Sequence, residues 1–217
     1  MVRVILVRHG ETEWNRLRLV LGGNSDTPLN EKGKRQAESL ALRLKSEKIQ
    51  AICSSPLHRS LDTAQAIARH HRMEVGIEPD LRELNLGELE GIPIADVGGS
   101  FDELLIISRQ GEELPRAPGG ESLRDVQQRA WSAIQRLVSQ YPDGVIVVVS
   151  HYFTILAIIC SVLNLPLSQM VRLGLALGSI STLIFDDGDP HLVLFNDTCH
   201  LTTDSNNNVV FSLLSHL

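Results

Sequence analysis

The chain has 217 residues, of which 43% are hydrophobic and 21% are charged, so it can bury a sizeable core and is neither disordered nor fibrous. Twenty Lys and Arg against 26 Asp and Glu give a formal net charge of -6, which disfavours a broad nucleic-acid surface because that surface must be basic. The three cysteines have no C-x-x-C spacing, so we expect free thiols in a reducing compartment and no cysteine zinc site.

Secretion and membrane insertion are also disfavoured by the sequence. Val2–Val7 has the pattern of a strand and lacks the charged and then apolar regions of a signal peptide. The longest nearly apolar stretch, Tyr152–Leu163, has about twelve residues, against the roughly twenty that a transmembrane helix needs. We therefore expect a cytoplasmic protein that has no membrane partner.

Strand and helix patterns alternate through the first third of the chain. Val2–Val7 is an aliphatic run too short for a helix, so it predicts a buried strand. A good N-cap residue and helical spacing predict an amphipathic helix from about Asn30 to Lys48. The next predicted elements are a short strand, Ala51–Ser54, and a helix whose apolar stripe includes Leu61 and Ala68.

The middle of the chain loses this periodicity. Val75–Ile77 has the pattern of an edge strand, and Gly and Pro become frequent from Leu86 to Gly120. We interpret residues 86–120 as a cap inserted over one end of the sheet. No repeat, low-complexity tract or linker interrupts the chain, so residues 1–217 are predicted to form a single domain.

Helix and strand signals return after the cap. Ser122 and Asp125 have the spacing of a capping box and begin a helix that ends before Pro142. Val145–Val149 is typical of a central parallel strand, because it is apolar at every position and so suits burial on both faces. The remaining predicted elements are a buried helix and a closing hairpin, Tyr152–Leu163, Ile180–Phe185 and Leu192–Phe195.

This alternation predicts an α/β fold with three α/β/α layers, in which helices cover both faces of a mostly parallel sheet. Ligands of such folds bind beyond the carboxyl ends of the strands. His9 and His151 each follow a predicted strand directly, so we expect them to meet at one mouth of the sheet.

The residues at these strand ends suit chemistry on a phosphate. A neutral imidazole such as that of His9 attacks phosphorus when one ring nitrogen is free and the other donates to a fixed acceptor. Arg8 and Arg59 are candidates to neutralise the phosphate, and His151 with the first amides of its helix is expected to face it from the other side. Glu83 is a candidate proton donor that later activates water, provided that its surroundings raise its pKa.

Each of these residues taken singly has a structural explanation, such as a hydrogen-bonded histidine or a surface arginine. Their shared placement after parallel strands favours the functional interpretation. The other histidines have no metal-binding spacing, and glycine motifs for nucleotides are absent from the sequence. We therefore predict no metal and no cofactor.

The segment Leu6–Asn15, LVRHGETEWN, resembles the signature of the histidine phosphatase superfamily, which includes cofactor-dependent phosphoglycerate mutase and many small-molecule phosphatases. The resemblance covers essentially the whole chain and implies a phosphoglycerate mutase-like fold. Further matching segments occur in the family's order, namely Gly23–Leu29, Ser54–Ser60, Thr63–Ala64, Glu83–Leu84, Gly87, Glu90–Gly91, Gly119–Ser122 and Ser150–His151.

The resemblance also implies roles for individual residues. His9 would be the phosphorylated nucleophile and Glu83 the proton donor and acceptor. The phosphate pocket would be formed by Arg8, Arg59 and His151. Asn15, Asn24 and Ser25 would contact the phosphoryl group or the substrate.

One position departs from the family pattern. Members usually have a small residue after the second histidine, whereas this chain has Tyr152, which would narrow the pocket or add a hydroxyl contact to the substrate. Related mutases cluster basic residues in the cap, but residues 86–120 contain only Arg109 and Arg116, which favours hydrolysis. Apolar cap residues, Phe101 and Leu104–Ile107, indicate either a substrate with a hydrophobic body or a contact in a homodimer.

The leading hypothesis is a metal-independent phosphomonoesterase, a histidine acid-type phosphatase that hydrolyses a small-molecule phosphate ester through a phosphohistidine. α-Ribazole phosphatase is the more specific prediction. The alternatives are a cofactor-dependent phosphoglycerate mutase and a phospholigand-binding module that lacks turnover.

Overall fold

The computed structural model describes residues 1–97 and 116–201, and the strands of these ranges form one sheet in the order β3-β2-β4-β1-β5-β6. Neighbouring strands among the first four are parallel, whereas β5 pairs antiparallel with β1 and β6 antiparallel with β5. The mostly parallel sheet predicted from the sequence is therefore confirmed. The strands are β1 (Val2–Arg8), β2 (Ile49–Ser54), β3 (Gly76–Ile77), β4 (Gly144–Ser150), β5 (Ile180–Asp186) and β6 (Asp189–Asp197).

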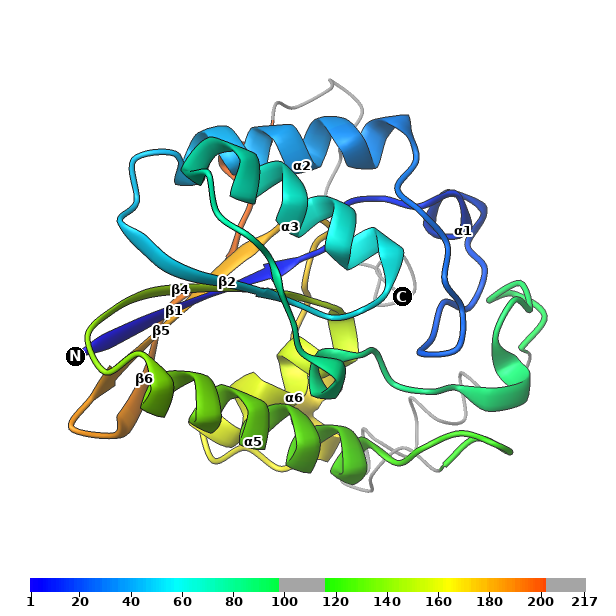
Figure 1. The fold of residues 1–217 in the computed structure, drawn as a ribbon. Coiled ribbons are helices and arrows are strands. Elements are labelled where there is room, and N and C mark those ends of the chain that lie inside the picture. Colours follow the sequence, from blue (N-terminus) through cyan, green and yellow to red (C-terminus); the bar gives the residue numbers. More distant parts are fainter. Residues whose placement is uncertain (98–115, 202–217) are drawn as a thin grey trace.

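Helices cover both faces of this sheet, as the three-layer prediction requires (Figure 1). The pair α2 and α3 lies on one face, and the pair α5 and α6 lies on the other. The α-helices are α1 (Glu13–Leu17), α2 (Glu31–Leu44), α3 (His58–His71), α5 (Leu123–Gln140) and α6 (Tyr152–Val162). Short 3₁₀ helices are η1 (Pro79–Leu81), η2 (Gly87–Leu89) and η3 (Leu167–Arg172).

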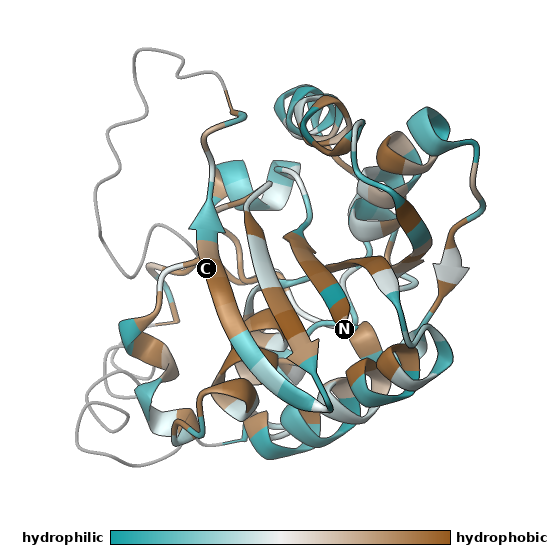
Figure 2. Ribbon diagram, turned by 90° about the vertical axis from the view of Figure 1, so that its left-hand side faces the viewer, coloured by the Kyte–Doolittle hydropathy of each residue, from teal (hydrophilic) through white to brown (hydrophobic). Residues whose placement is uncertain are grey.

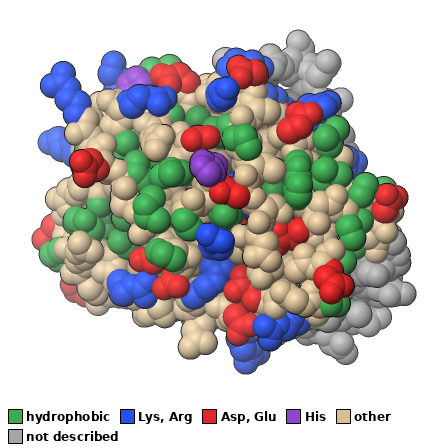
Figure 3. Space-filling model, turned by 45° about the vertical axis from the view of Figure 1, so that its right-hand side comes forward, with side chains coloured by type: hydrophobic (Ala, Val, Ile, Leu, Met, Phe, Trp, Pro, Cys, Tyr) green, Lys and Arg blue, Asp and Glu red, His purple; other side chains and the backbone are tan. Residues whose placement is uncertain are grey.

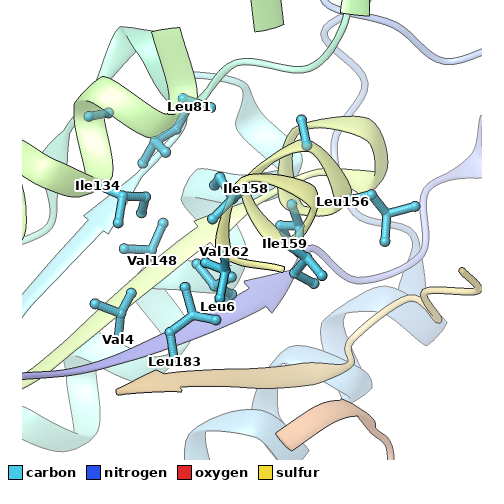
Figure 4. Close-up of a cluster of buried hydrophobic side chains, with 14 of the residues drawn as sticks. Val4, Leu6, Leu81, Ile134, Val148, Leu156, Ile158, Ile159, Val162 and Leu183 are labelled. Carbon is cyan, nitrogen blue, oxygen red and sulfur yellow. The ribbon is translucent and has the colours of Figure 1, made fainter. Parts of the chain in front are cut away.

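The two central strands supply a hydrophobic core on each side. Leu6 and Val148 pack into the cluster under α5 and α6, part of which is shown in Figure 4. Their chain neighbours Ile5 and Val147 pack instead against α2 and α3. Because successive side chains of a strand point to opposite faces, an uninterrupted aliphatic strand serves both cores. The hydropathy of the sheet in Figure 2 shows the same apolar centre.

Element ends differ from the sequence predictions by a few residues. The helix predicted to reach Lys48 ends at Leu44, where the amide of Lys45 donates to the carbonyl of Leu42 at 3.3 Å and the chain tightens into a turn. The N-cap at Asn30 is confirmed, and its side chain accepts from Gly33 N. The sequence patterns did not indicate α1, which has only 5 residues.

Most of the predicted cap, residues 98–115, lies outside the described residues. Its two ends are described and are held together by backbone hydrogen bonds. Glu88 N donates to Pro118 O at 3.2 Å, and Glu121 N donates to Asn85 O at 3.0 Å. The single domain and the inserted cap stay predictions.

In residues 1–97 and 116–201, every helix is too short or too polar to cross a membrane.

Replacement of Ile134 tests the core under α5. Ile134 is fully buried in the cluster of Figure 4, so Ile134→Ala is expected to lower the free energy of unfolding by about 2–5 kcal/mol through lost burial and a residual cavity. Leu42→Ala on α2 is the control, because Leu42 is 58% exposed and its loss should change stability by less than about 0.5 kcal/mol. Urea unfolding measures both, and equal small effects would argue against the described packing.

Candidate active site

The pairing of β1 with β4 brings two histidines together. Arg8 and Ser150 are register partners at the ends of these strands, so His9 and His151 leave the sheet side by side. His9 N donates to Ser150 O at 3.1 Å, and the two imidazole centroids are 5.1 Å apart. Both rings are buried, with residue exposures of 2% and 0%. The structure thus places both histidines at one mouth of the sheet.

A hydrogen bond orients the His9 ring. Its Nδ1 lies 2.7 Å from Gly10 O, and because a carbonyl oxygen only accepts, Nδ1 carries the hydrogen. In the neutral ring the lone pair is then on Nε2. Burial, together with the positive charges of Arg59 and Arg8, holds the pKa of His9 well below its ordinary value. His9 is therefore a neutral imidazole whose Nε2 is suited to attack an electrophile.

The loop after His9 depends on a close backbone approach. A Cβ at Gly10 would lie 2.5 Å from Gly33 O, so a larger residue would push the end of β1 away from α2. Gly10 N donates to Thr63 Oγ1 of α3 at 3.2 Å. The sequence assigned Thr63 no role of its own, because this role depends on how α3 packs against the end of β1.

His151 is held by serines from the neighbouring strand and helix. Its Nε2 lies 2.7 Å from Ser55 Oγ, just after β2, and 3.3 Å from Ser60 Oγ on α3. Its Nδ1 is buried and has no hydrogen-bond partner within the described ranges. Burial lowers the pKa of His151 well below its ordinary value, and Arg59 lowers it further.

Two buried arginines place positive charge beside these rings. Arg59 is fully buried in α3 and donates from Nη1 to Ser25 O at 2.6 Å and from Nη2 to Gly22 O at 3.0 Å. Arg8 is 3% exposed and donates from Nη1 to Leu175 O. Burial lowers the pKa of each guanidinium to about 10, so both are charged at neutral pH.

Three buried nitrogens of this cluster lack a partner in the described part of the chain, namely Nε of Arg8, Nε of Arg59 and Nδ1 of His151. Buried polar groups are normally paired, because an unmade hydrogen bond costs free energy. Donors of this kind suit a negatively charged group that accepts hydrogen bonds. The arrangement can therefore bind an oxyanion next to His9.

Glu83 lies in the segment between η1 and η2 and is 4% exposed, and its side chain reaches the N-terminus of α6. Its carboxylate accepts from Leu84 N at 2.8 Å and from the amides of Phe153 and Thr154, both at 3.3 Å. The expectation that these first amides of α6 face the phosphate is wrong, because the carboxylate of the chain itself occupies the positive end of the helix. Burial raises the pKa of Glu83, and these hydrogen bonds and the two arginines oppose the rise only in part.

Arg129 on α5 fixes the backbone that carries Glu83. Its Nη1 donates at 2.6 Å to the carbonyls of Asp80 and Arg82, and its Nη2 donates to Glu83 O at 3.1 Å. It also pairs with Glu121 at 2.7 Å. The sequence analysis missed Arg129, because nothing in its local sequence distinguishes it from other helical arginines.

Asn15, Asn24 and Ser25, the three residues predicted to contact the phosphoryl group or the substrate, lie in different places. Asn15 lines the cavity at His9, and its side-chain oxygen caps α1. The Asn24 amide donates to Asn85 Oδ1 at 2.9 Å, and the Ser25 hydroxyl donates to Glu90. The Glu90 carboxylate also accepts from the backbone nitrogen of Asn24 at 3.1 Å, so it holds the loop. The sequence assigned no role to Glu90.

Tyr152, the departure from the family pattern, supports Arg8. The Arg8 guanidinium carbon lies 4.9 Å from the centroid of the Tyr152 ring, which is the geometry of a cation–π contact. The Tyr152 hydroxyl donates to Leu173 O at 3.1 Å. The two expected effects were a narrower pocket and a hydroxyl contact with the substrate. The structure has the Tyr152 ring in the cavity wall, whereas the hydroxyl is bonded to the backbone.

The cavity beside His9 combines a polar end with apolar walls. Its lining residues are Arg8, His9, Asn15, Val20, Leu21, Glu83, Leu86, Ile94, Tyr152 and Phe153. Arg59 and His151 do not line it. Figure 3, turned toward the carboxyl ends of the strands, shows acidic and basic side chains interspersed on that face. The two arginines of the site are buried beneath this face. Among the described residues, no three His, Cys, Asp or Glu side chains are grouped to hold a metal ion.

NMR of the imidazole nitrogens tests the protonation of this site. Because burial and the arginines lower both pKa values, His9 and His151 are expected to stay neutral at about pH 6, below the ordinary value of about 6.5. In urea the unfolded chain takes up these protons, so both histidines contribute a loss of stability as the pH falls below about 6.5. The urea-unfolded chain is the control, and an imidazolium spectrum for either residue in the folded protein would refute the assignment.

Comparison with known proteins agrees with this geometry. The model of the histidine phosphatase superfamily (branch 1) matches residues 4–198. The chain is 38% identical over 181 residues to the probable phosphoglycerate mutase GpmB of Proteus mirabilis, covering 83% of this chain and 84% of that protein. It is 34% identical over 204 residues to phosphoserine phosphatase 1 of Hydrogenobacter thermophilus, covering 93% and 95%.

Solved structures extend the comparison. Phosphoserine phosphatase from Entamoeba histolytica in complex with 3-phosphoglyceric acid has a TM-score of 0.83 at 34% identity, covering 93% of this chain and all of that one. A mycobacterial glucosyl-3-phosphoglycerate phosphatase complexed with VO3 has a TM-score of 0.82 at 29% identity, covering 90% and 99%. Phosphatases among these relatives support an enzyme with phosphatase activity. The chain belongs to the histidine phosphatase superfamily.

Proposed function

We propose that this protein is a phosphomonoesterase that transfers the phosphoryl group of a small phosphate ester to His9 and then to water, and needs no metal ion. One observation carries the proposal. A neutral His9 with its lone pair on Nε2 is clustered with Arg8, Arg59 and His151, each of which has a buried nitrogen without a partner among the described residues. A nucleophile next to an oxyanion site is the arrangement that phosphoryl transfer requires.

In the first step, Nε2 of His9 forms a bond to phosphorus as the bond to the ester oxygen breaks. The leaving oxygen takes the proton of the Glu83 carboxylic acid, which the raised pKa of this buried group makes available. Arg8, Arg59 and His151 donate hydrogen bonds to the phosphoryl oxygens, where negative charge is spread in the transition state. The Nδ1–Gly10 bond stabilises the charge that His9 acquires.

In the second step, water attacks the phosphohistidine. Glu83, now a carboxylate, takes a proton from this water as the new P–O bond forms and the bond from phosphorus to His9 breaks. Inorganic phosphate leaves, and both His9 and the acid form of Glu83 are regenerated. Each group thus works in both halves of the cycle.

The remaining predicted residues have supporting roles in this proposal. Asn15 and Tyr152 contact the substrate from the cavity wall, where both lie. Asn24 and Ser25 form the loop whose backbone Arg59 and Glu90 hold. The α-ribazole substrate, the homodimer and the cytoplasmic location stay predictions.

A phosphoglycerate mutase is the second candidate, because several relatives are named probable phosphoglycerate mutase GpmB. Such an enzyme must bind a second acidic group and shield its phosphohistidine from water. Arg109 and Arg116 are the cations of residues 86–120, and Arg116 Nε already donates to Gly120 O at 2.7 Å. Hydrolysis is therefore favoured, and a requirement for a bisphosphorylated primer would distinguish the mutase.

Phosphate release from an aryl phosphate in excess chelator tests the leading proposal. The wild type is expected to turn over at the same rate with and without chelator, and His9→Ala to lose about a thousandfold or more because the nucleophile is gone. His191→Ala is the control, since this exposed histidine lies on β6 away from the site. Chelator-sensitive turnover, or an active His9→Ala, is incompatible with the mechanism. A wild type that binds vanadate but releases no phosphate would identify a binding module.

The role of Glu83 predicts how activity depends on the leaving group and on pH. Glu83→Gln is expected to cost about 10²–10⁴ in kcat/KM for an alkyl phosphate, and less for a nitrophenyl phosphate, whose leaving group needs little protonation. Because the acid form acts first, wild-type kcat/KM for the alkyl ester should fall as the pH rises through the raised pKa of Glu83. Glu83→Gln should lose this limb of the profile, whereas Glu74→Gln at an exposed position should keep it. Equal losses for both esters would exclude the acid role.

A further inference from the structure

The position of Glu83 determines where the alcohol part of the substrate lies. In the proposed first step its carboxylic acid gives a proton to the ester oxygen, so the carbon body attached to this oxygen begins beside Glu83. Glu83 lines the cavity at His9 and also a second cavity, which His9 does not line. The first has a volume of about 20 Å³, enough for about one water molecule, whereas the second has a volume of about 450 Å³. The second cavity is therefore the one with room for the carbon body.

The second cavity is lined by more cations than anions. Its charged lining residues are Arg82, Arg116, Arg129, Glu83 and Glu121. Arg129 and Glu121 form an ion pair at 2.7 Å, so their charges offset each other. Glu83 is uncharged in the acid form that begins the reaction, and burial raises its pKa in favour of that form. Two positive charges remain, those of Arg82 and Arg116.

Neither of these two guanidinium groups has an anionic partner in the part of the chain that the structure describes. Arg82 Nη1 donates to Gly23 O at 3.2 Å, and Arg116 Nε donates to Gly120 O at 2.7 Å. A guanidinium has five N–H groups, so each arginine keeps donors for a further acceptor. Both residues are exposed, so an oxyanion that enters the cavity can reach them without breaking a buried ion pair.

We propose that the substrate is a phosphate monoester whose alcohol carries a second oxyanionic group, a carboxylate or another phosphate, which Arg82 and Arg116 bind in the second cavity. The planar fork of an arginine pairs with two oxygens of such a group. This inference rests on the proposed function and names its substrate class. It is compatible with hydrolysis, because a mutase must in addition keep water away from its phosphohistidine.

Three esters with the same three-carbon chain test this substrate class. 3-Phosphooxypropanoate carries a carboxylate, 1,3-propanediol bisphosphate carries a second phosphate, and propyl phosphate carries neither. For at least one of the two anionic esters, kcat/KM is expected to exceed that of propyl phosphate by about tenfold or more, which is the effect of one charge-assisted hydrogen bond. The ester with the larger ratio identifies which oxyanion the two arginines bind.

Replacement of the two arginines tests whether they cause this preference. The variant that carries both Arg82→Gln and Arg116→Gln should lower the ratio by about tenfold, because both cations are gone. Arg116→Glu alone should also lower it, and this exposed position is remote from Glu83 in the sequence. Arg69→Gln, at the far end of α3 from the site, is the matched control and should keep the wild-type ratio. Vanadate has no carbon body, so equal inhibition of all variants shows that the phosphate end is intact.

The outcomes separate this inference from the proposed function. Ratios near one for both anionic esters in the wild type, or a preference that survives the loss of both arginines, would overturn the oxyanion subsite while leaving the phosphatase intact. Absence of phosphate release from these esters and from an aryl phosphate alike would overturn both. A wild-type preference that the Arg82 and Arg116 variants lose and Arg69→Gln keeps would establish the inference.

Discussion

The parallel pairing of β1 with β4 is the constraint on which the site depends. The two strands end in register at Arg8 and Ser150, so the residues that follow leave the sheet at the same height and next to each other. A slip of one residue would turn His9 to the other face and exchange the two hydrophobic cores. The register of this pairing therefore fixes the geometry of the two histidines as well as the division of the two cores.

Buried positive charge is the second feature of the site, and the protein stabilises it with backbone carbonyls. Arg59 donates to Ser25 O and Gly22 O, and Arg8 donates to Leu175 O, so backbone carbonyls orient each guanidinium. Burial and these positive charges keep both histidines neutral, and three nitrogens of the cluster have no partner in the described part of the chain. Preorganised donors of this kind favour an oxyanion because they need not reorient during the reaction.

Most of the fold could be predicted from local patterns. The Val145–Val149 run indicated a central parallel strand, and the Ser122–Asp125 capping box marked the start of α5 correctly. The residues adjoining strand ends could also be predicted, since strand order brings such positions together. The ends of elements such as α2 were less predictable, because tertiary contacts and local turns decide where a helix stops.

The supporting contacts of the site could not be predicted, because they join segments far apart in the sequence. Glu83 accepts from the first amides of α6, a pairing that no local pattern indicates. Arg129 holds the backbone of Glu83 from α5, and Ser55 holds His151 from the end of β2. Tyr152 was noticed only as an unusual residue, whereas its contact with Arg8 requires the packed structure.

The most direct measurement of the central claim is to quench a reaction with base within milliseconds and to locate the protein-bound phosphate by peptide mass spectrometry. We expect one phosphorylated residue, His9, with the acid-labile and base-stable bond of a phosphohistidine. Phosphate on His151 or on a serine, or its absence from the protein during steady turnover, would contradict it.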